Sequence, residues 1–309
     1  MINRVLIRVK VVQMLYSYLL TRPERTFKQA LKDLQVSLEK SYDLYLYLIK
    51  LIPDLTYLEE RRLDDAKHKF LPTEEDLHPN TRFVDNALVQ AINSNPQVEK
   101  LFRDHDVSWS DDPIFMRLLL DKVLNSDIYQ QYMQMPSTDL ESDTELWRQL
   151  LRKVIIEDED MEEQLQNRSL YLSGEDLEMM GQFAIKSLTK IAMGEDEPIR
   201  PMFKDQEDSV FGEELFTKTI RDMDDNNVLI DSCIRSEKWD RNRVALMDRI
   251  IMCAAITEFK CFDKIPIAAT LNEYIELAKV FSTPNSGQFV NGVLNAVAEE
   301  LRTRGRINK

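Results

Sequence analysis

No glycine occurs before Gly174, and the whole chain of 309 residues contains only 7. Loops that cradle phosphates need glycine, because this residue adopts positive φ and lets the backbone approach a ligand closely. The segment before Gly174 therefore cannot hold a Rossmann or P-loop nucleotide site, and the later glycines are isolated. Tight hairpins also depend on glycine. The scarcity predicts long helices and few hairpins.

Apolar residues follow helical spacing at both ends of the chain. The spacing predicts a helix over residues 3–20 and a second one that begins after Thr26 and ends at Pro53. No strand-like alternation is sustained, so the predicted fold class is all-α. The other expected helices cover 81–93, 113–133, 138–166, 174–193, 210–236, 240–259 and 266–281, with a last one after Gly287.

The chain divides into three segments by pattern and charge. Residues 137–216 carry 21 acidic and 8 basic side chains, a net charge of −13 out of −14 for the whole chain. We therefore expect N-terminal core helices over 1–54, an acidic helical insertion over 55–204 and a C-terminal bundle over 205–309. The two outer segments should pack as one body, because each has apolar stripes that need a partner. The acidic run over 156–163 is interpreted as a solvated helix face, not a metal site.

No pattern indicates an enzyme. The three cysteines, Cys233, Cys253 and Cys261, form no CxxC pair, and no catalytic motif links them to a histidine. We expect no cofactor, no metal site and no membrane span, and a cytoplasmic location.

Two features stand out as candidates for phosphate or base contacts. Arg4 and Arg8 lie one turn apart on an otherwise apolar helix, with Lys10 nearby. The segment 281–292, FSTPNSGQFVNG, is a polar turn that leads into a helix whose free N–H groups favour anions. Phe289, one turn inside that helix, fits a buried core position better than a base-stacking one.

Three segments resemble the NusB family of transcription antitermination factors. They read RVKVVQMLYSY (8–18), DRIIMCAAITEF (248–259) and IAATLNEYIELAKVFSTPNSGQFVNGVLNAV (267–297), in the family's order. The resemblance implies two small helical bundles that share one core, binding of single-stranded boxA-type RNA, a heterodimer with the ribosomal protein NusE, and a place in the RNA polymerase antitermination complex. It also implies a part in ribosomal RNA synthesis and maturation.

The resemblance also assigns residue roles. RNA contacts fall on Arg4, Arg8, Lys10, Gln13, Asn285, Ser286, Gln288 and Phe289, and partner contacts fall on Tyr16 and Asp248. In two places the chain departs from the family pattern. Apolar residues 5–7 occupy the middle of the family's arginine cluster, which implies low intrinsic RNA affinity, and Asn285 replaces an acidic residue.

Two other functions stay open at this point. The first is a protein-interaction scaffold that has the same fold and little RNA affinity, which the charge of the insertion favours. The second is an RNA methyltransferase with a NusB-like domain, although the glycine-rich cofactor loop is missing.

Overall fold

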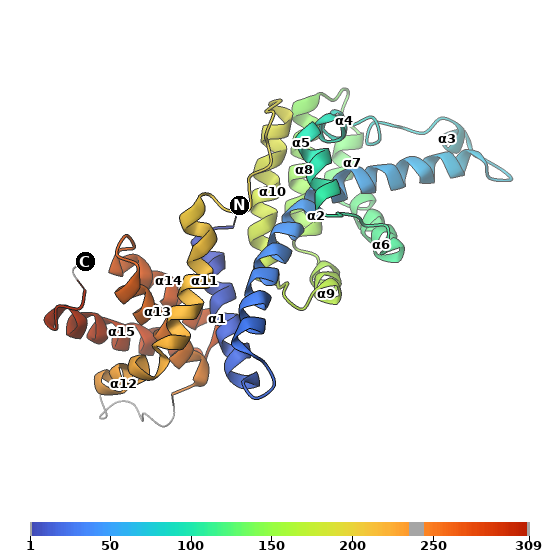
Figure 1. Ribbon diagram of the computed structural model, residues 1–309. Coiled ribbons are helices and arrows are strands. Elements are labelled where there is room, and N and C mark those ends of the chain that lie inside the picture. The colour runs from blue at the N-terminus through green and yellow to red at the C-terminus, as the bar shows by residue number, and fades with distance from the viewer. Residues whose placement is uncertain (1, 235–243, 308–309) are drawn as a thin grey trace. The chain divides into compact units, whose positions relative to one another are not determined.

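The computed structural model describes residues 2–234 and 244–307, and every regular element in these ranges is helical (Figure 1). The protein is all-α, as predicted. In chain order the elements are α1 (Arg4–Thr21), α2 (Phe27–Lys67), α3 (Glu74–Leu77), α4 (Ala87–Ser94), α5 (Pro96–Asp104), α6 (Pro113–Leu124), α7 (Asp127–Met133), α8 (Leu140–Leu150), a π-helical turn η1 (Leu151–Ile155), α9 (Glu159–Arg168), α10 (Gly174–Ala192), α11 (Gln206–Arg221), α12 (Met223–Cys233), α13 (Leu246–Cys261), α14 (Ile267–Phe281) and α15 (Ser286–Thr303).

The prediction that the second helix ends at Pro53 is wrong, because α2 continues to Lys67 with this proline inside it. A proline in a helix interior removes one hydrogen bond and costs about 3 kcal/mol. The neighbouring side chains of Ile52 and Leu55 are completely buried, so the packing of both sides of the proline outweighs this cost. The start of the helix is as predicted, since Thr26 and Gln29 form reciprocal capping bonds.

Three of the long helices that the periodicity predicts are interrupted in the structure. In the range 113–133 the break comes where Ser126 accepts a hydrogen bond from the backbone of Tyr129 and caps α7. In the range 138–166, Asp158 caps α9 in the same way. In the range 210–236, Asp222 separates α11 from α12. The predicted start at Asp240 lies outside the described residues.

The chain forms two compact units. Unit 1 covers residues 39–202, and unit 2 combines residues 2–38 with residues 203–309. The first border therefore falls inside α2, between Leu38 and Glu39, and not at residue 54 where the sequence placed it. The second border lies within two residues of the expected one.

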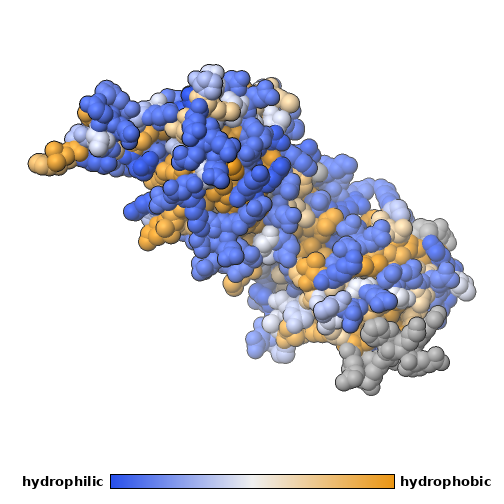
Figure 2. Space-filling view, turned by 180° about the vertical axis from the view of Figure 1, so that it is seen from behind, coloured by the Kyte–Doolittle hydropathy of each residue, from blue (hydrophilic) through white to orange (hydrophobic). Residues whose placement is uncertain are grey.

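In unit 1, Leu48, Ile49, Leu51 and Ile52 of α2 are completely buried, and α4, α8 and α10 pack against one another. Buried polar bonds join α2 to α10, between Ser41 and Asp176 at 2.7 Å and between Tyr45 and Ser187. The loop after α2 carries Phe70, which is 98% exposed. Figure 2 shows hydrophobic surface at the tip that is formed by the end of α2 and the loop after it.

Unit 2 is organised around α13, which contacts α1, α11, α12, α14 and α15. The side chains of α13 from Ile250 to Phe259 are all buried, as expected for a helix that has neighbours on every side. Gly212 lets α11 approach α1 closely, because a Cβ atom at this position would lie 2.9 Å from the side chain of Ile7. These contacts place the first helix in one unit with the C-terminal helices.

Candidate nucleic-acid interface

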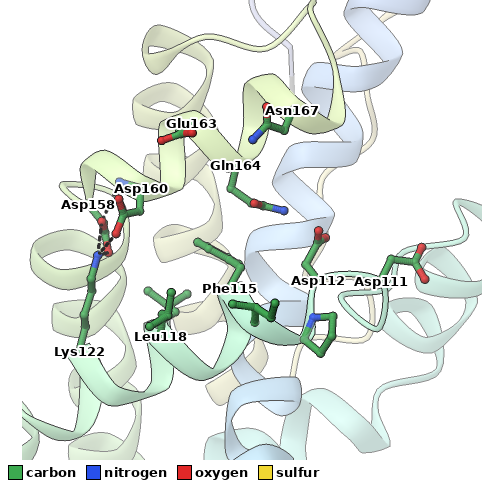
Figure 3. Close-up of a pocket in the computed structure, with 13 residues that line it drawn as sticks. Asp111, Asp112, Phe115, Leu118, Lys122, Asp158, Asp160, Glu163, Gln164 and Asn167 are labelled. Atoms are coloured by element: carbon green, nitrogen blue, oxygen red, sulfur yellow. Dashed lines mark hydrogen bonds and ion pairs between the residues drawn. The ribbon is translucent and has the colours of Figure 1, made fainter.

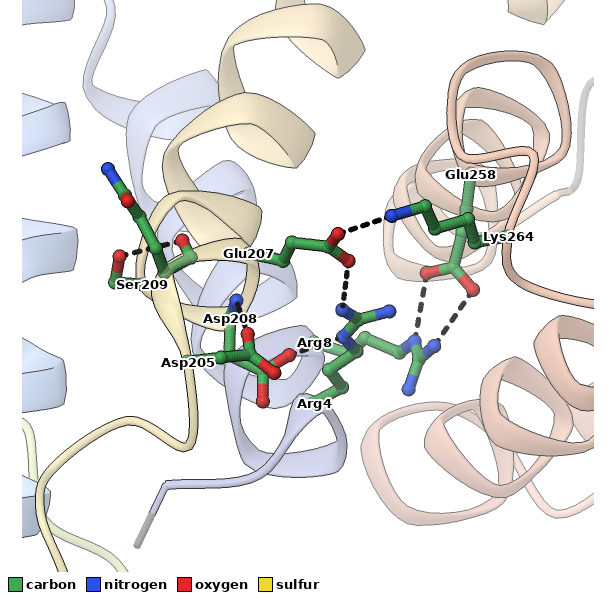
Figure 4. Close-up of polar contacts among 9 residues, drawn as sticks. Arg4, Arg8, Asp205, Glu207, Asp208, Ser209, Glu258 and Lys264 are labelled. Atoms are coloured by element: carbon green, nitrogen blue, oxygen red, sulfur yellow. Dashed lines mark hydrogen bonds and ion pairs between the residues drawn. The ribbon is translucent and has the colours of Figure 1, made fainter.

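Arg8 does not reach the surface. Its guanidinium donates two hydrogen bonds of 2.9 Å to the carboxylate of Glu258 on α13, and both side chains are buried (Figure 4). Glu258 also accepts hydrogen bonds from Thr270 at 2.7 Å and from Tyr274 at 3.3 Å. Burial lowers the pKa of Arg8, but the hydrogen bonds and charge of Glu258 outweigh it and raise this pKa above its usual value. Arg8 therefore stabilises the core, and the expectation that it contacts phosphate does not fit its position.

Arg4 lies one turn earlier and keeps 30% of its side chain exposed. Its Nε atom donates to Asp208 on α11 at 2.6 Å, and Glu207 lies 3.7 Å from its Nη2 atom (Figure 4). Glu207 also forms an ion pair with Lys264. Glu207 is exposed, so its ion pair with Arg4 contributes little, whereas Asp208 is buried and would lose its guanidinium partner if Arg4 turned toward a phosphate.

The other predicted residues of α1 are largely inside. Lys10 is completely buried. Gln13 and Tyr16 are half-buried. Among the three predicted cations of α1, Arg8 and Lys10 are therefore buried, and Arg4 is the one that solvent reaches best.

Of the predicted residues in and after the turn before α15, two are exposed and two are buried. Asn285 and Gln288 are exposed, whereas Ser286 and Phe289 are buried at 2% and 5% relative exposure. The hydroxyl of Ser286 donates at 3.0 Å to Asp248, the buried carboxylate in the first turn of α13. Asp248 thus holds the turn from beneath. Phe289 packs in the core, so it has no exposed face on which a base could stack.

The structure does not bring the two predicted groups together. Glu258, beside Arg8, and Asp248, beneath the turn, lie ten residues apart along α13. At 1.5 Å per residue this separation is about 15 Å. The two groups lie toward opposite ends of α13 and do not form one junction.

A polar face on α15 completes the candidate interface; the sequence predicted Asn285 and Gln288 as RNA contacts but not Asn291 and Asn295. Gln288, Asn291 and Asn295 are exposed and recur every three or four residues, as one helix face requires. Asn295 donates to the side chain of Asn291 at 2.6 Å, which fixes the orientation of both amides. No charged residue occurs from Val280 to Ala298, in a chain that is 30% charged. That gap is the sequence signal that could have revealed the face. We call Asn285, Gln288, Asn291 and Asn295 the amide face.

The chemistry of the described residues gives no sign of catalysis. They contain no group of histidine, cysteine or acidic side chains suited to a metal ion. Burial raises the pKa of Cys253 to about 12, so this thiol stays protonated near neutral pH. None of the described helices is long and apolar enough to span a membrane.

Comparison with known proteins identifies the family. The transcription antitermination protein NusB of Salinibacter ruber is 34% identical over 126 residues, which are 41% of this chain and 72% of that protein. The chain belongs to the NusB family. The NusB protein of Koribacter versatilis is 40% identical over 100 residues, 32% of this chain and 67% of that protein. That of Thermotoga petrophila is 43% identical over 83 residues, 26% of this chain and 58% of that protein. No solved structure matches the chain.

The profile of the NusB family matches residues 149–299. This match contains α13, α14, the turn and the amide face, and it extends into the acidic segment that was expected to be an insertion. It does not include α1, although α1 packs with the matched C-terminal helices in unit 2. The relatives are named transcription antitermination proteins, so the family is non-enzymatic and the methyltransferase interpretation is set aside.

Proposed function

We propose that the protein is a cytoplasmic, RNA-binding transcription antitermination factor, which binds boxA-type single-stranded RNA as a heterodimer with NusE. In this proposal it acts within the RNA polymerase antitermination complex and aids the synthesis and maturation of ribosomal RNA. The amide face, which lies in the family-matched region and begins at the first turn of α15, is the observation that carries the proposal.

Side-chain amides suit the recognition of unpaired bases. Each amide offers donors and an acceptor that can pair with base edges, and single-stranded RNA exposes those edges. Asn285 makes no side-chain hydrogen bond to cap α15, and the N–H of Ser286 donates to the carbonyl of Thr283 at 2.8 Å, so the N–H groups of Gly287 and Gln288 are those available to a phosphate. The uncharged surroundings add no repulsion of the RNA backbone.

Few cations support this face, so the intrinsic affinity should be low. Lys279 lies beside Gly287 in the first turn of α15 and keeps 54% of its side chain exposed. It offers one phosphate contact, for which the log-log salt slope on single-stranded RNA is about −0.7. A protein partner such as NusE would have to add the remaining binding surface.

The test is fluorescence anisotropy with a labelled boxA RNA and a scrambled RNA of the same composition, in the presence of NusE. The double variant Gln288→Ala, Asn291→Ala should lose at least tenfold in affinity for boxA and little for the scrambled RNA, because base contacts carry the discrimination. Lys279→Ala should lower the affinity for both RNAs equally. Gln206→Ala, which removes an exposed amide from α11, is the matched control.

The scaffold hypothesis is the second candidate, and the burial of Arg8 and Lys10 favours it. It predicts that the NusE complex binds boxA and scrambled RNA with equal affinity, and that the Gln288→Ala, Asn291→Ala variant behaves as the unmutated protein. That result would replace the RNA-binding proposal.

A further inference from the structure

A groove of about 600 Å³ in unit 1 lies between α6 and α9 (Figure 3). Phe115 and Leu118 line it from α6, and Glu163 and Gln164 line it from α9. It lies outside the amide face and takes no part in the proposed RNA contacts. We call it the α6–α9 groove.

The side of this groove formed by α6 is apolar and uncovered. Ile114 is 71% exposed and Leu118 is 54% exposed, and the two lie four residues apart on one helix face. Adjacent large apolar side chains in a concave site are typical of a surface that a partner covers.

Both ends of the groove are held by ion pairs. At one end Lys122 of α6 reaches Asp158 at 2.7 Å and Asp160 at 2.6 Å, ahead of and within the first turn of α9. At the other end Arg168, the last residue of α9, pairs with Asp112, just before α6, and its guanidinium lies 4.4 Å from the ring of Trp109. The groove is therefore preformed, which lowers the entropic cost of binding a ligand.

The charges around the groove determine whether a binding partner must be positively or negatively charged. It is lined by five carboxylates and one ammonium group: Asp111, Asp112, Asp158, Asp160, Glu163 and Lys122. This surplus repels RNA, and it repels a second copy of a chain whose net charge is −14. It attracts a cationic segment.

We propose that the α6–α9 groove binds a basic segment of a partner protein, in which one or two large apolar side chains stand between lysines or arginines. The apolar side chains cover Ile114 and Leu118, and the cations pair with Asp111 and Glu163, the lining carboxylates that take no part in the ion pairs at the two ends. α6 has 12 residues and is about 18 Å long, so a helical segment of about 12 residues matches its length.

The test uses a fluorescent synthetic peptide of about 12 residues, built from lysine and leucine with leucines at helical spacing, and the full-length protein. One matched peptide replaces leucine by alanine, and another replaces lysine by glutamate. The double variant Ile114→Gln, Leu118→Gln removes the apolar side of the groove. Leu170→Gln, Met193→Gln is its control, because these residues are 96% and 73% exposed in unit 1 and lie outside the groove.

The proposal predicts that the lysine–leucine peptide binds the unmutated protein, that Ile114→Gln, Leu118→Gln weakens this binding at least tenfold, and that the control variant does not change it. A second variant, Asp111→Asn with Glu163→Gln, leaves the apolar side intact and should weaken binding at low ionic strength but much less at about 0.5 M salt. Circular dichroism of each variant checks that it is folded.

Two results would overturn the proposal. Equal binding of the leucine and alanine peptides, or by the Ile114→Gln, Leu118→Gln variant and the unmutated protein, would show only general attraction to an acidic surface. A dimer in sedimentation experiments that Ile114→Gln, Leu118→Gln dissociates would show that the groove joins two copies of this chain.

Discussion

Substitution of Arg8 by methionine tests whether this arginine stabilises the core or binds RNA. Methionine keeps much of the aliphatic stem and removes the guanidinium, so Glu258 loses both 2.9 Å hydrogen bonds in a fully buried position. Removal of one partner of a buried ion pair costs about 3–5 kcal/mol. Glu258 keeps its bonds from Thr270 and Tyr274, so we expect the lower end, about 3 kcal/mol.

Amide hydrogen exchange of α13 is the suitable assay. Both described tryptophans, Trp109 and Trp147, lie in unit 1, so their fluorescence does not report on unit 2. A loss of about 3 kcal/mol corresponds to exchange of the most protected α13 amides that is roughly 100-fold faster, because each 1.4 kcal/mol is a factor of ten.

Two variants make the comparison sharp. Arg4→Met replaces another arginine one turn away, and because its pair with Asp208 is less buried than the Arg8–Glu258 pair, we expect a smaller loss than in Arg8→Met. Arg8→Met with Glu258→Gln removes the buried carboxylate charge and should recover part of the loss, since a neutral amide oxygen can still accept from Thr270. Unchanged α13 exchange in Arg8→Met, together with weaker RNA binding, would refute the argument from burial.

Two further predictions concern single residues. Gly212→Ala should destabilise unit 2 by about 1–3 kcal/mol, measured by hydrogen exchange, because the new methyl group meets Ile7. The methyl group of Gly292→Ala enters open space, so this variant should stabilise α15 by up to about 1 kcal/mol. Equal effects of the two variants would contradict the close approach of α11 to α1. Hydrogen bonds from Lys69 and the backbone of Thr73 lower the pKa of Asp76 to about 2. The carboxylate therefore stabilises α3 above its unfolded pKa of about 3.8, and this contribution disappears as the pH falls toward 2. An NMR titration of Asp76 with a midpoint near 4 would show that these bonds do not form.

Periodicity predicted the helices that bury one continuous stripe, such as α1 and α10, because the hydrophobic effect acts on a pattern that local sequence displays. It did not predict the breaks at Ser126 and Asp158. Many serines and aspartates occur in this chain, and only the packing of the two flanking helices decides which of them becomes a cap. The continuation of α2 past Pro53 has the same origin, since the burial that outweighs the proline comes from distant segments.

The site was less predictable than the fold. The sequence shows Arg4 and Arg8 one turn apart, but the partner that buries Arg8 is Glu258, 250 residues later. The burial of Phe289 was the favoured interpretation of its position, whereas the use of Asp248 beneath the turn depends on a contact with Ser286 that only the folded chain creates. The amide face needed no long-range contact and could have been read from the uncharged stretch of α15.

The two proposed surfaces differ in a way that one ionic-strength series can separate. The amide face has one nearby cation, Lys279, so RNA binding should weaken only slightly with salt. The α6–α9 groove combines five carboxylates with an apolar side, so the binding of a basic peptide should fall steeply at first and then level off once the charges are screened and burial of Ile114 and Leu118 remains. If both ligands instead showed the same steep and continuous decrease, the general charge of the protein would explain both, and neither surface would be specific.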